Sequence, residues 1–194
     1  MAVDEQNNVW LGSDDERLLY WDRAKDSWVD RRPGNTGVIK GIQILPDGSV
    51  WVILPTLAKL IGFNPNTMRW EKEYRFDTLS TAIRQTTDGR LILATGDDVI
   101  LMNPHSGVRQ VLNREPVNGQ IRAFEQDVEG NIWIGTHEFG LVKIDRSGKT
   151  TYWTTKNSAI SSDKIFSLHI DRNNLLWIGT WHGGLLSFSP ENGQ

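Results

Sequence analysis

Cysteine is absent from this chain of 194 residues. Without thiols the protein has no disulfide, no thiolate-bound metal and no cysteine nucleophile. Long apolar runs are also missing, and no stretch of 18 or more apolar residues is available to cross a bilayer as a helix. Helical periodicity does not extend over any segment of ten or more residues. These absences direct attention to short, strand-like segments.

The chain also has little net charge. It contains 21 Lys and Arg against 24 Asp and Glu, which gives a formal charge of -3 and a pI near 5.8. This balance provides no attraction for phosphate backbones, so we expect no nucleic-acid partner. Residues 1–4 lead directly into the first repeat described below, without the charged and apolar regions of a signal peptide. We therefore expect either a cytosolic protein or a piece cut from a longer chain.

One short motif recurs along the sequence. It reads GNIWIGT at Gly130–Thr136 and LLWIGT at Leu175–Thr180, with looser copies at Asn8–Ser13 and Ser49–Val52. Self-similarity with a fixed period should be sought before any other feature, because it decides the whole fold.

The spacing of the motif shows that its recurrence is not chance. Trp10 and Trp51 are 41 residues apart, Trp133 and Trp177 are 44 apart, and Trp51 and Trp133 are 82 apart, with Ile92 midway between them. A period of about 40 to 45 residues built from short strands is typical of propeller blades. The copy around Ile92 has no tryptophan, but it keeps the spacing of the repeat.

Other landmarks keep the same phase and divide each period into four strands. Trp28, Trp70, Val111 and Trp153 follow the reference position by 18 to 20 residues, on the expected fourth strand. The inner strands are expected at 39–45, 80–86, 121–127 and 165–171, and the repeat units at 1–37, 38–78, 79–119, 120–162 and 163–194. We predict an all-β protein, a β-propeller of four-stranded antiparallel blades with about five blades present in part.

Both ends of the sequence fall inside repeat units. The first unit lacks most of its inner strand, and the last stops before any fourth strand. We expect a single partial propeller domain that is a slice of a larger one, with a complete five-bladed ring as the alternative. Open strand edges template pairing with other chains, so a homo-oligomer formed through these edges is a further expectation.

The segment Asp127–Thr136, followed by Gly140, Leu141 and Asp145, strongly resembles the two-component regulator propeller repeat, and so does Asp171–Thr180. The third copy departs from the pattern, with Ile92 and Ala94 in place of Trp and Gly. The resemblance implies the periplasmic sensor region of a bacterial signalling protein that precedes a membrane span and an output domain. Many members of that family sense oligosaccharides, so the resemblance implies a small-molecule or oligosaccharide ligand.

The loops that follow the reference strand differ from copy to copy, and a variable loop on a fixed frame is where specificity is usually located. In a propeller these loops emerge on one face, so we expect their polar and aromatic residues to share a rim. Trp181 stands out, because nothing in the repeat requires an aromatic residue beside His182 and two glycines. The candidate ligand-binding residues are Trp181, His182, His137, Glu138, Asp97, Asp98, Asp14 and Asp15. The alternative interpretation is that these residues form a solvated loop rim that binds no ligand.

Most other aromatic residues have a structural explanation. Tryptophans at one strand position flanked by β-branched residues are expected between blades as core, and the same expectation applies to Trp28, Trp70 and Trp153. The Asp-x-x-Gly-x-x-Trp pattern superficially resembles the sialidase Asp-box, which is a turn element and not a catalytic one.

We predict no metal and no cofactor. The paired aspartates of two loops lack calcium-loop spacing, and His137 and His182 lack a close-spaced zinc pattern. No catalytic motif is evident, so we expect a binding module that is not an enzyme. The alternatives are a scaffold for protein partners or self-assembly and, less favoured, a carbohydrate-active lyase or hydrolase.

Overall fold

The computed structural model describes residues 1–13, 15, 17–31, 37–79, 81–96 and 98–189, and these form β-strands with one short 3-10 helix. In chain order the elements are β1 (Ala2–Val3), β2 (Val9–Gly12), β3 (Leu18–Asp22), β4 (Ser27–Asp30), β5 (Gly41–Ile44), β6 (Val50–Leu54), η1 (Pro55–Leu57), β7 (Lys59–Asn64), β8 (Arg69–Arg75), β9 (Arg84–Gln85), β10 (Leu91–Thr95), β11 (Asp98–Met102), β12 (Arg109–Val111), β13 (Ile121–Gln126), β14 (Ile132–Thr136), β15 (Leu141–Ile144), β16 (Thr150–Trp153), β17 (Ile165–Ile170), β18 (Leu176–Thr180) and β19 (Gly184–Phe188).

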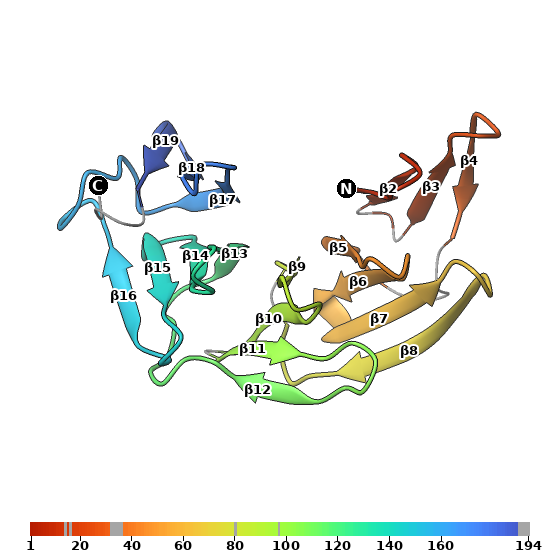
Figure 1. Ribbon diagram of the computed structural model, residues 1–194, viewed down its shortest axis with the longest axis horizontal. Helices are drawn as coiled ribbons and strands as arrows, with labels where there is room; N and C mark the ends of the chain where they lie inside the picture. The colour runs from red at the N-terminus through yellow and green to blue at the C-terminus, as the bar shows by residue number, and fades with distance from the viewer. Residues whose placement is uncertain (14, 16, 32–36, 80, 97, 190–194) are drawn as a thin grey trace. The chain divides into compact units, whose positions relative to one another are not determined.

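The strands form five antiparallel sheets, each built from strands that follow one another in the chain (Figure 1). The sheet orders are β1-β2-β3-β4, β5-β6-β7-β8, β12-β11-β10-β9, β13-β14-β15-β16 and β17-β18-β19. We call each of these sheets a blade. The predicted all-β class of propeller blades is therefore confirmed, and the fifth blade has three strands among the described residues.

Strand register confirms the period that the sequence predicts. The reference tryptophan pairs with the inner-strand residue eight positions before it in four blades: Trp10 with Ala2, Trp51 with Gln43, Trp133 with Glu125 and Trp177 with His169. Ile92 lies in the second strand of its blade, β10, and pairs with Leu101. The tryptophan-bearing strands therefore occupy equivalent places within their blades.

The third blade departs from its prediction at the inner strand. We predicted a strand over 80–86, and of the described residues 81–86 the structure places Arg84–Gln85 in a strand. Residues just before β9 pack against the preceding blade, because a Cβ placed on Gly41 would lie 2.9 Å from the carbonyl oxygen of Thr81 and 3.0 Å from Cγ2 of Ile83.

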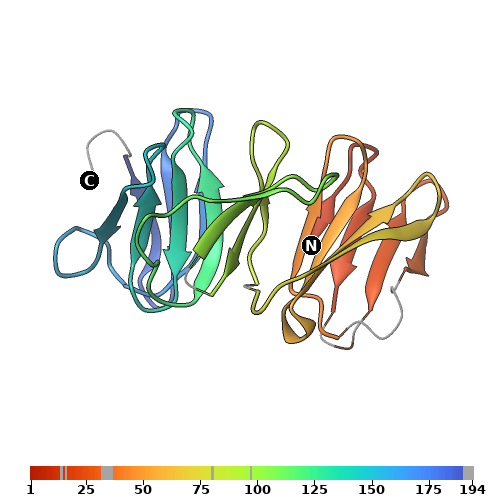
Figure 2. The same ribbon diagram turned by 90° about the horizontal axis from the view of Figure 1, so that it is seen from below.

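The chain divides into two compact units, Met1–Gln85 and Thr86–Gln194. Within each unit, strands of neighbouring blades run alongside one another (Figure 2). The first unit has a core between its first two blades, made of Trp10, Leu18, Ile39, Val50, Val52, Leu54, Ile61 and Phe63. The second has a core between its last two blades, made of Trp133, Leu141, Ile160, Ile165, Leu176, Ile178 and Phe188.

Three of the four reference tryptophans are buried as predicted, with Trp10, Trp51 and Trp133 at most 3% exposed, and Trp177 is half-buried. Trp28 contradicts the expectation of a core position, since its side chain is 49% exposed. It lies on the outermost strand β4 and contacts only Trp21 among aromatic rings of the described residues, with ring centroids 5.1 Å apart. The equivalent Trp70 and Trp153, on the outer strands β8 and β16, pack against the two cores and are half-buried, whereas Trp28 is in neither core.

The glycine of the repeated motif marks a close approach between blades of one unit in two of the copies. A Cβ on Gly12 would lie 2.4 Å from Cγ2 of Ile39, and a Cβ on Gly135 would lie 2.6 Å from Cγ2 of Ile165. Both distances are shorter than real Cβ contacts, so a side chain at either position would force the neighbouring isoleucine to shift. Glycine at these two positions therefore allows close packing of neighbouring blades, whereas the second and third copies have Ile53 and Ala94 at the equivalent positions.

The aspartate of the motif fixes the turn before the tryptophan strand. The Asp127 carboxylate, which is 2% exposed, accepts hydrogen bonds from the backbone N–H of Asn131 at 2.8 Å and from the indole N–H of Trp133 at 2.9 Å. Asp171 accepts the indole N–H of Trp177 at 3.0 Å in the same way. The interpretation of this motif as a turn element is consistent with these contacts.

Candidate functional site

The candidate site lies in the second unit, on the loops that follow β14 and β18. Each loop begins with a hydrogen bond to the residue just before its own inner strand, from the His137 N–H to the Gln120 carbonyl at 2.9 Å and from the Trp181 N–H to the Lys164 carbonyl at 2.8 Å. These two bonds are equivalent in the repeat and set where both loops leave the sheet. The loop side chains are therefore placed by backbone contacts.

A threonine hydroxyl forms a hydrogen bond across the base of each of these loops. The Thr136 hydroxyl donates to the Gly140 carbonyl at 2.8 Å, and the Thr180 hydroxyl donates to the Gly184 carbonyl at 2.9 Å. In the second loop His182 takes a left-handed backbone conformation with φ of 62°. Such a conformation is uncommon for a residue with a side chain and occurs in tight turns.

Two bulges of the inner strands add further side chains. The pairing of β13 with β14 shifts register between Ile121 and Ala123, and that of β17 with β18 shifts between Ile165 and Ser167. The extra residues are Arg122 and Phe166, 44 positions apart, as are Trp133 and Trp177. A β-bulge redirects the side chain of its extra residue, which brings Arg122 and Phe166 out of the strand alternation.

Four rings and one guanidinium meet at this place. The ring centroids of His137 and Phe166 are 5.7 Å apart, those of Phe166 and Trp181 are 5.3 Å apart, and those of Trp181 and His182 are 5.0 Å apart. The Arg122 guanidinium carbon lies 5.4 Å from the Phe166 centroid. These separations are those of favourable aromatic and cation–π contacts. We call these five residues the ring cluster.

The ring cluster faces solvent with apolar surface. Phe166 is 38% exposed and Trp181 is 53% exposed, although both are large and apolar. The Arg122 Nε is buried and has no hydrogen-bond partner among the described residues. At the edge of the cluster, the Glu138 carboxylate lies 3.7 Å from Nδ1 of His137. The cluster thus combines exposed ring faces with unused hydrogen-bonding groups.

The structure brings together only part of the predicted set. Trp181, His182 and His137 meet in the ring cluster, and Glu138 adjoins it. Asp98 opens β11 on another blade of the second unit, where it pairs with Thr95. Asp14 and Asp97 lie outside the described residues.

Asp15 belongs to the first unit, and its carboxylate is already engaged. It accepts hydrogen bonds from the Arg17 side chain, with the Arg17 Nε at 2.7 Å, and from the Ser13 hydroxyl. The hydrogen bond from Arg17, followed by that from Ser13, lowers the pKa of Asp15 to about 2. The Asp15 carboxylate therefore stabilises the loop after β2 through its contacts with Ser13 and Arg17.

Sequence reasoning missed Phe166 and Arg122. Both precede the small inner-strand residue that the repeat makes recognisable, Ser167 or Ala123. Strict alternation does not reveal which residue is extra in a bulge. The only available signal was the shared phase of the two residues in the repeat.

The described residues contain no group of three or more His, Asp or Glu side chains arranged to hold a metal ion. None of the described elements is a helix with the length and apolar character needed to traverse a bilayer.

Two stretches of the chain, residues 115–138 and 159–182, match a family model. The match is to the two component regulator propeller. Each stretch includes an inner strand, a motif turn, a tryptophan strand and the start of a cluster loop. The predicted resemblance is therefore confirmed over the two blades that carry the ring cluster. No curated protein matches the chain.

Several solved structures share the fold. PorZ, a surface component of the type-IX secretion system of Porphyromonas gingivalis, matches with a TM-score of 0.78 and 20% identity over 100% of this chain and 32% of its own. The extracellular domain of BT4673 from B. thetaiotaomicron, described as part of a hybrid two component system, matches with a TM-score of 0.77 and 19% identity over 95% of this chain and 26% of its own.

Virginiamycin B lyase from Staphylococcus aureus matches with a TM-score of 0.77 and 13% identity, over 97% of this chain and 68% of the lyase. Identities this low establish a common propeller fold and nothing further. This chain spans about a third or less of PorZ and BT4673 and about two thirds of the lyase.

Proposed function

We propose that this chain is the ligand-sensing propeller region of a bacterial two-component-type receptor, located outside the cytoplasm, and that the ring cluster holds the ligand. The match to the regulator propeller repeat supports the receptor role. The observation that carries the proposal is the exposed row of rings formed by His137, Phe166, Trp181 and His182. A soluble surface rarely gathers such groups unless they contact something.

The chemistry of the cluster favours an oligosaccharide. The apolar C–H face of a sugar ring stacks on an aromatic face, and Trp181 and Phe166 offer two neighbouring faces inclined by 33°. Sugar hydroxyls both donate and accept, which suits the imidazoles of His137 and His182. The Arg122 Nε–H is a further donor in need of an acceptor. We propose a binding role without catalysis.

A glycan array followed by calorimetric titration of each hit tests this function. The Trp181→Ala, His182→Ala double variant should weaken binding by about 10-fold or more, if a sugar ring gains as much from stacking on one aromatic ring as a nucleic-acid base does, about 1–3 kcal/mol. Trp28→Ala is the matched control, since Trp28 is exposed to a similar degree, 49% against 53%, and lies in the other unit.

Two results would contradict the proposal. One is an array on which no glycan binds. The other is a double variant that keeps the affinity of the parent chain, which would remove Trp181 and His182 from the site. A loss of affinity in Trp28→Ala as large as that of the double variant would assign the effect to general destabilisation.

A second candidate function is self-assembly through a sheet edge. Among the described residues β19 pairs only with β18, and its Leu185 is 67% exposed. An open edge with an exposed apolar residue is a template for pairing with another strand. Light scattering over a range of concentrations decides the matter, because a chain that stays monomeric throughout does not assemble through this edge.

A further inference from the structure

A groove of about 600 Å³ lies in the second unit, at the end of β14 opposite to the loop that carries His137. Its walls are the β9–β10 turn near Asp88, the β13–β14 turn near Asp127, the β15–β16 turn near Asp145, and the residues that follow β12 up to Arg114. This volume falls in the range of sites that hold small molecules. The groove therefore has room for more than a single ion.

The three carboxylates of the groove are engaged by their own turns. Asp88 forms an ion pair with Arg90, with 2.6 Å between Oδ2 and Nη2, and the hydrogen bond from Arg90 is the main reason that the pKa of Asp88 is lowered to about 2. Asp127 is held by the motif contacts described above. Asp145 accepts the N–H of Ser147 at 2.8 Å and its hydroxyl at 2.7 Å.

Two guanidinium groups in the same groove have no such partner. Arg114 and Arg146 line the groove and are exposed, and neither forms an ion pair or a side-chain hydrogen bond within the part of the chain that the structure describes. The backbone N–H of Arg114 donates a hydrogen bond to the backbone carbonyl of Gly148 at 3.1 Å, and Gly148 is two residues beyond Arg146. The backbone therefore brings the two arginine positions to the same turn.

Each arginine side chain packs against a turn glycine. A Cβ on Gly130 would lie 2.9 Å from Nε of Arg146, and a Cβ on Gly148 would lie 3.1 Å from Cγ of Arg114. Both glycines have positive φ, 84° and 83°. The Arg146 side chain occupies the space that a side chain would fill at Gly130, and the Arg114 side chain shares the space at Gly148 with the Leu112 carbonyl, so both arginines contact the groove wall.

The equivalent groove of the first unit shows that the frame does not require this arrangement. That groove, of about 480 Å³, has Pro65 where the second has Arg146, and Pro65 lies over Gly48 as Arg146 lies over Gly130. It is lined by four carboxylates and two cationic side chains, whereas the second groove has three of each. The groove of the second unit is the more cationic of two repeat-equivalent places.

We propose that Arg114 and Arg146 bind a tetrahedral oxyanion, a sulfate or phosphate ester group of a small molecule, in the groove of the second unit. A guanidinium presents several N–H donors in a planar fork that matches two oxygens of such a group, and hydrogen bonds between two charged partners are about twice as strong as neutral ones. The remaining volume of the groove accommodates the rest of the molecule. This site is separate from the ring cluster, and its test does not depend on the proposed sensing of a glycan.

The test is a titration of the isotope-labelled chain with sodium sulfate and, separately, sodium phosphate, followed through the arginine Nε–H resonances by NMR. Ionic strength is held constant with sodium chloride, so that general screening does not change. We expect saturable shifts of the Arg114 and Arg146 resonances. Phosphate should bind more tightly as pH rises across neutrality and its second charge forms, while sulfate binding stays constant, which distinguishes the two groups.

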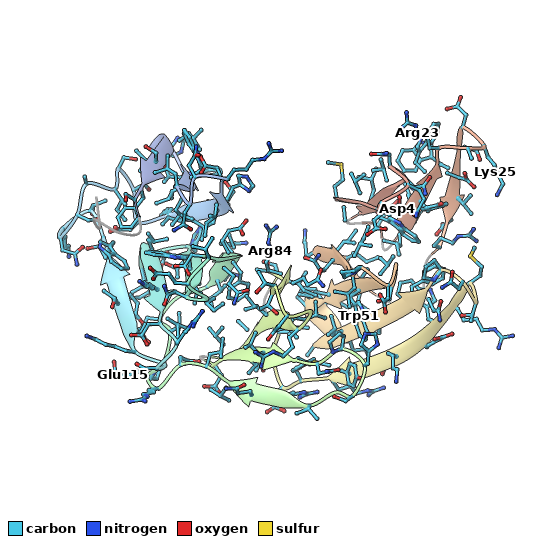
Figure 3. The ribbon with its side chains drawn as sticks, in the orientation of Figure 1. Asp4, Arg23, Lys25, Trp51, Arg84 and Glu115 are labelled. Carbon is cyan, nitrogen blue, oxygen red and sulfur yellow. The ribbon has the colours of Figure 1, made fainter. Side chains whose placement is uncertain are left out.

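Three variants complete the experiment. Arg146→Gln and Arg114→Gln should each weaken sulfate binding by about 10-fold or more. Arg23→Gln is the matched control, because Arg23 follows Asp22 in the β3–β4 turn as Arg146 follows Asp145 in the β15–β16 turn, and lies in the other unit (Figure 3). Arg146→Lys keeps the charge without the fork and should bind with intermediate affinity.

Several outcomes would overturn the proposal. These are shifts that do not saturate, equal loss of binding in Arg23→Gln and Arg146→Gln, undiminished binding in both groove variants, or binding of sodium acetate as tight as that of sulfate. Since both groove arginines are exposed, the variants should retain the circular dichroism spectrum and melting temperature of the parent chain within a few degrees.

Discussion

Replacing Asp127 by alanine should be one of the most damaging single changes in the second unit. Its carboxylate is 2% exposed and accepts hydrogen bonds from the backbone N–H and side-chain amide of Asn131, both at 2.8 Å, and from the indole N–H of Trp133 at 2.9 Å. Trp133 is fully buried and Asn131 is 5% exposed, so water does not readily replace the lost acceptor.

The magnitude follows from the donors that are left without an acceptor. A buried polar group without a partner costs about 1–3 kcal/mol, and at least two of the three donors, the Asn131 N–H and the Trp133 indole N–H, are buried. We therefore expect Asp127→Ala to lower the free energy of unfolding by about 2–5 kcal/mol. That range is a large part of the stability of an ordinary domain.

Asp171→Ala is the internal control, because it removes the same motif contact where the partner is less buried. Asp171 accepts the indole N–H of Trp177 at 3.0 Å, but both residues are half-buried. Water reaches these donors once the carboxylate is gone, so the loss should be about 1 kcal/mol.

Urea unfolding at pH 7, followed by tryptophan fluorescence and circular dichroism, measures both losses from shifts of the midpoint at unchanged slope. The reasoning fails if Asp127→Ala costs no more than Asp171→Ala, since burial of the donors would then not set the size of the effect. Asp127→Asn should lie between parent and alanine variant, because its remaining oxygen accepts some of the three bonds.

Two further predictions concern packing and pH. Gly135→Ala should lower the free energy of unfolding by about 1–3 kcal/mol in the same urea assay, because the new methyl group would lie 2.6 Å from Cγ2 of Ile165. An unchanged midpoint would contradict this prediction, since it would show that the two blades move apart to make room for the methyl group with no loss of stability. The Arg90 hydrogen bond lowers the pKa of Asp88 from 3.8 to about 2, so its contribution to stability is present above about pH 4 and is lost as pH falls toward 2. Asp88→Asn should therefore flatten the decline of melting temperature over that pH range, and a decline as steep as that of the parent chain would contradict the role of this pair.

Much of the frame was predictable because it repeats. The spacing of Trp10, Trp51, Trp133 and Trp177 placed one strand in each of four blades, and the degenerate copy at Ile92 fell into the same place. The outer strands were located correctly, but Trp28 was wrongly predicted to be buried. Its position in the repeat equals that of Trp70 and Trp153, which are half-buried, and only the packing of each blade separates them.

The candidate site was predictable only in part. His137, Trp181 and His182 were found because the loops that carry them break the repeat. Phe166 and Arg122 were not found, since each is the extra residue of a bulge and a bulge leaves no mark on the alternation of a single strand. The grouping of Arg114 with Arg146 also depends on which turns meet across neighbouring blades.

The sequence by itself determined the period, the strand order and the identity of the residues that hold each blade together, because every blade must satisfy the same local pairing and the same turn. Tertiary structure alone decided which side chains from different blades meet, as in the ring cluster of the second unit. The physical reason is that local hydrogen bonding repeats with the sequence, whereas contacts between blades depend on bulges and packing distances that no single repeat encodes.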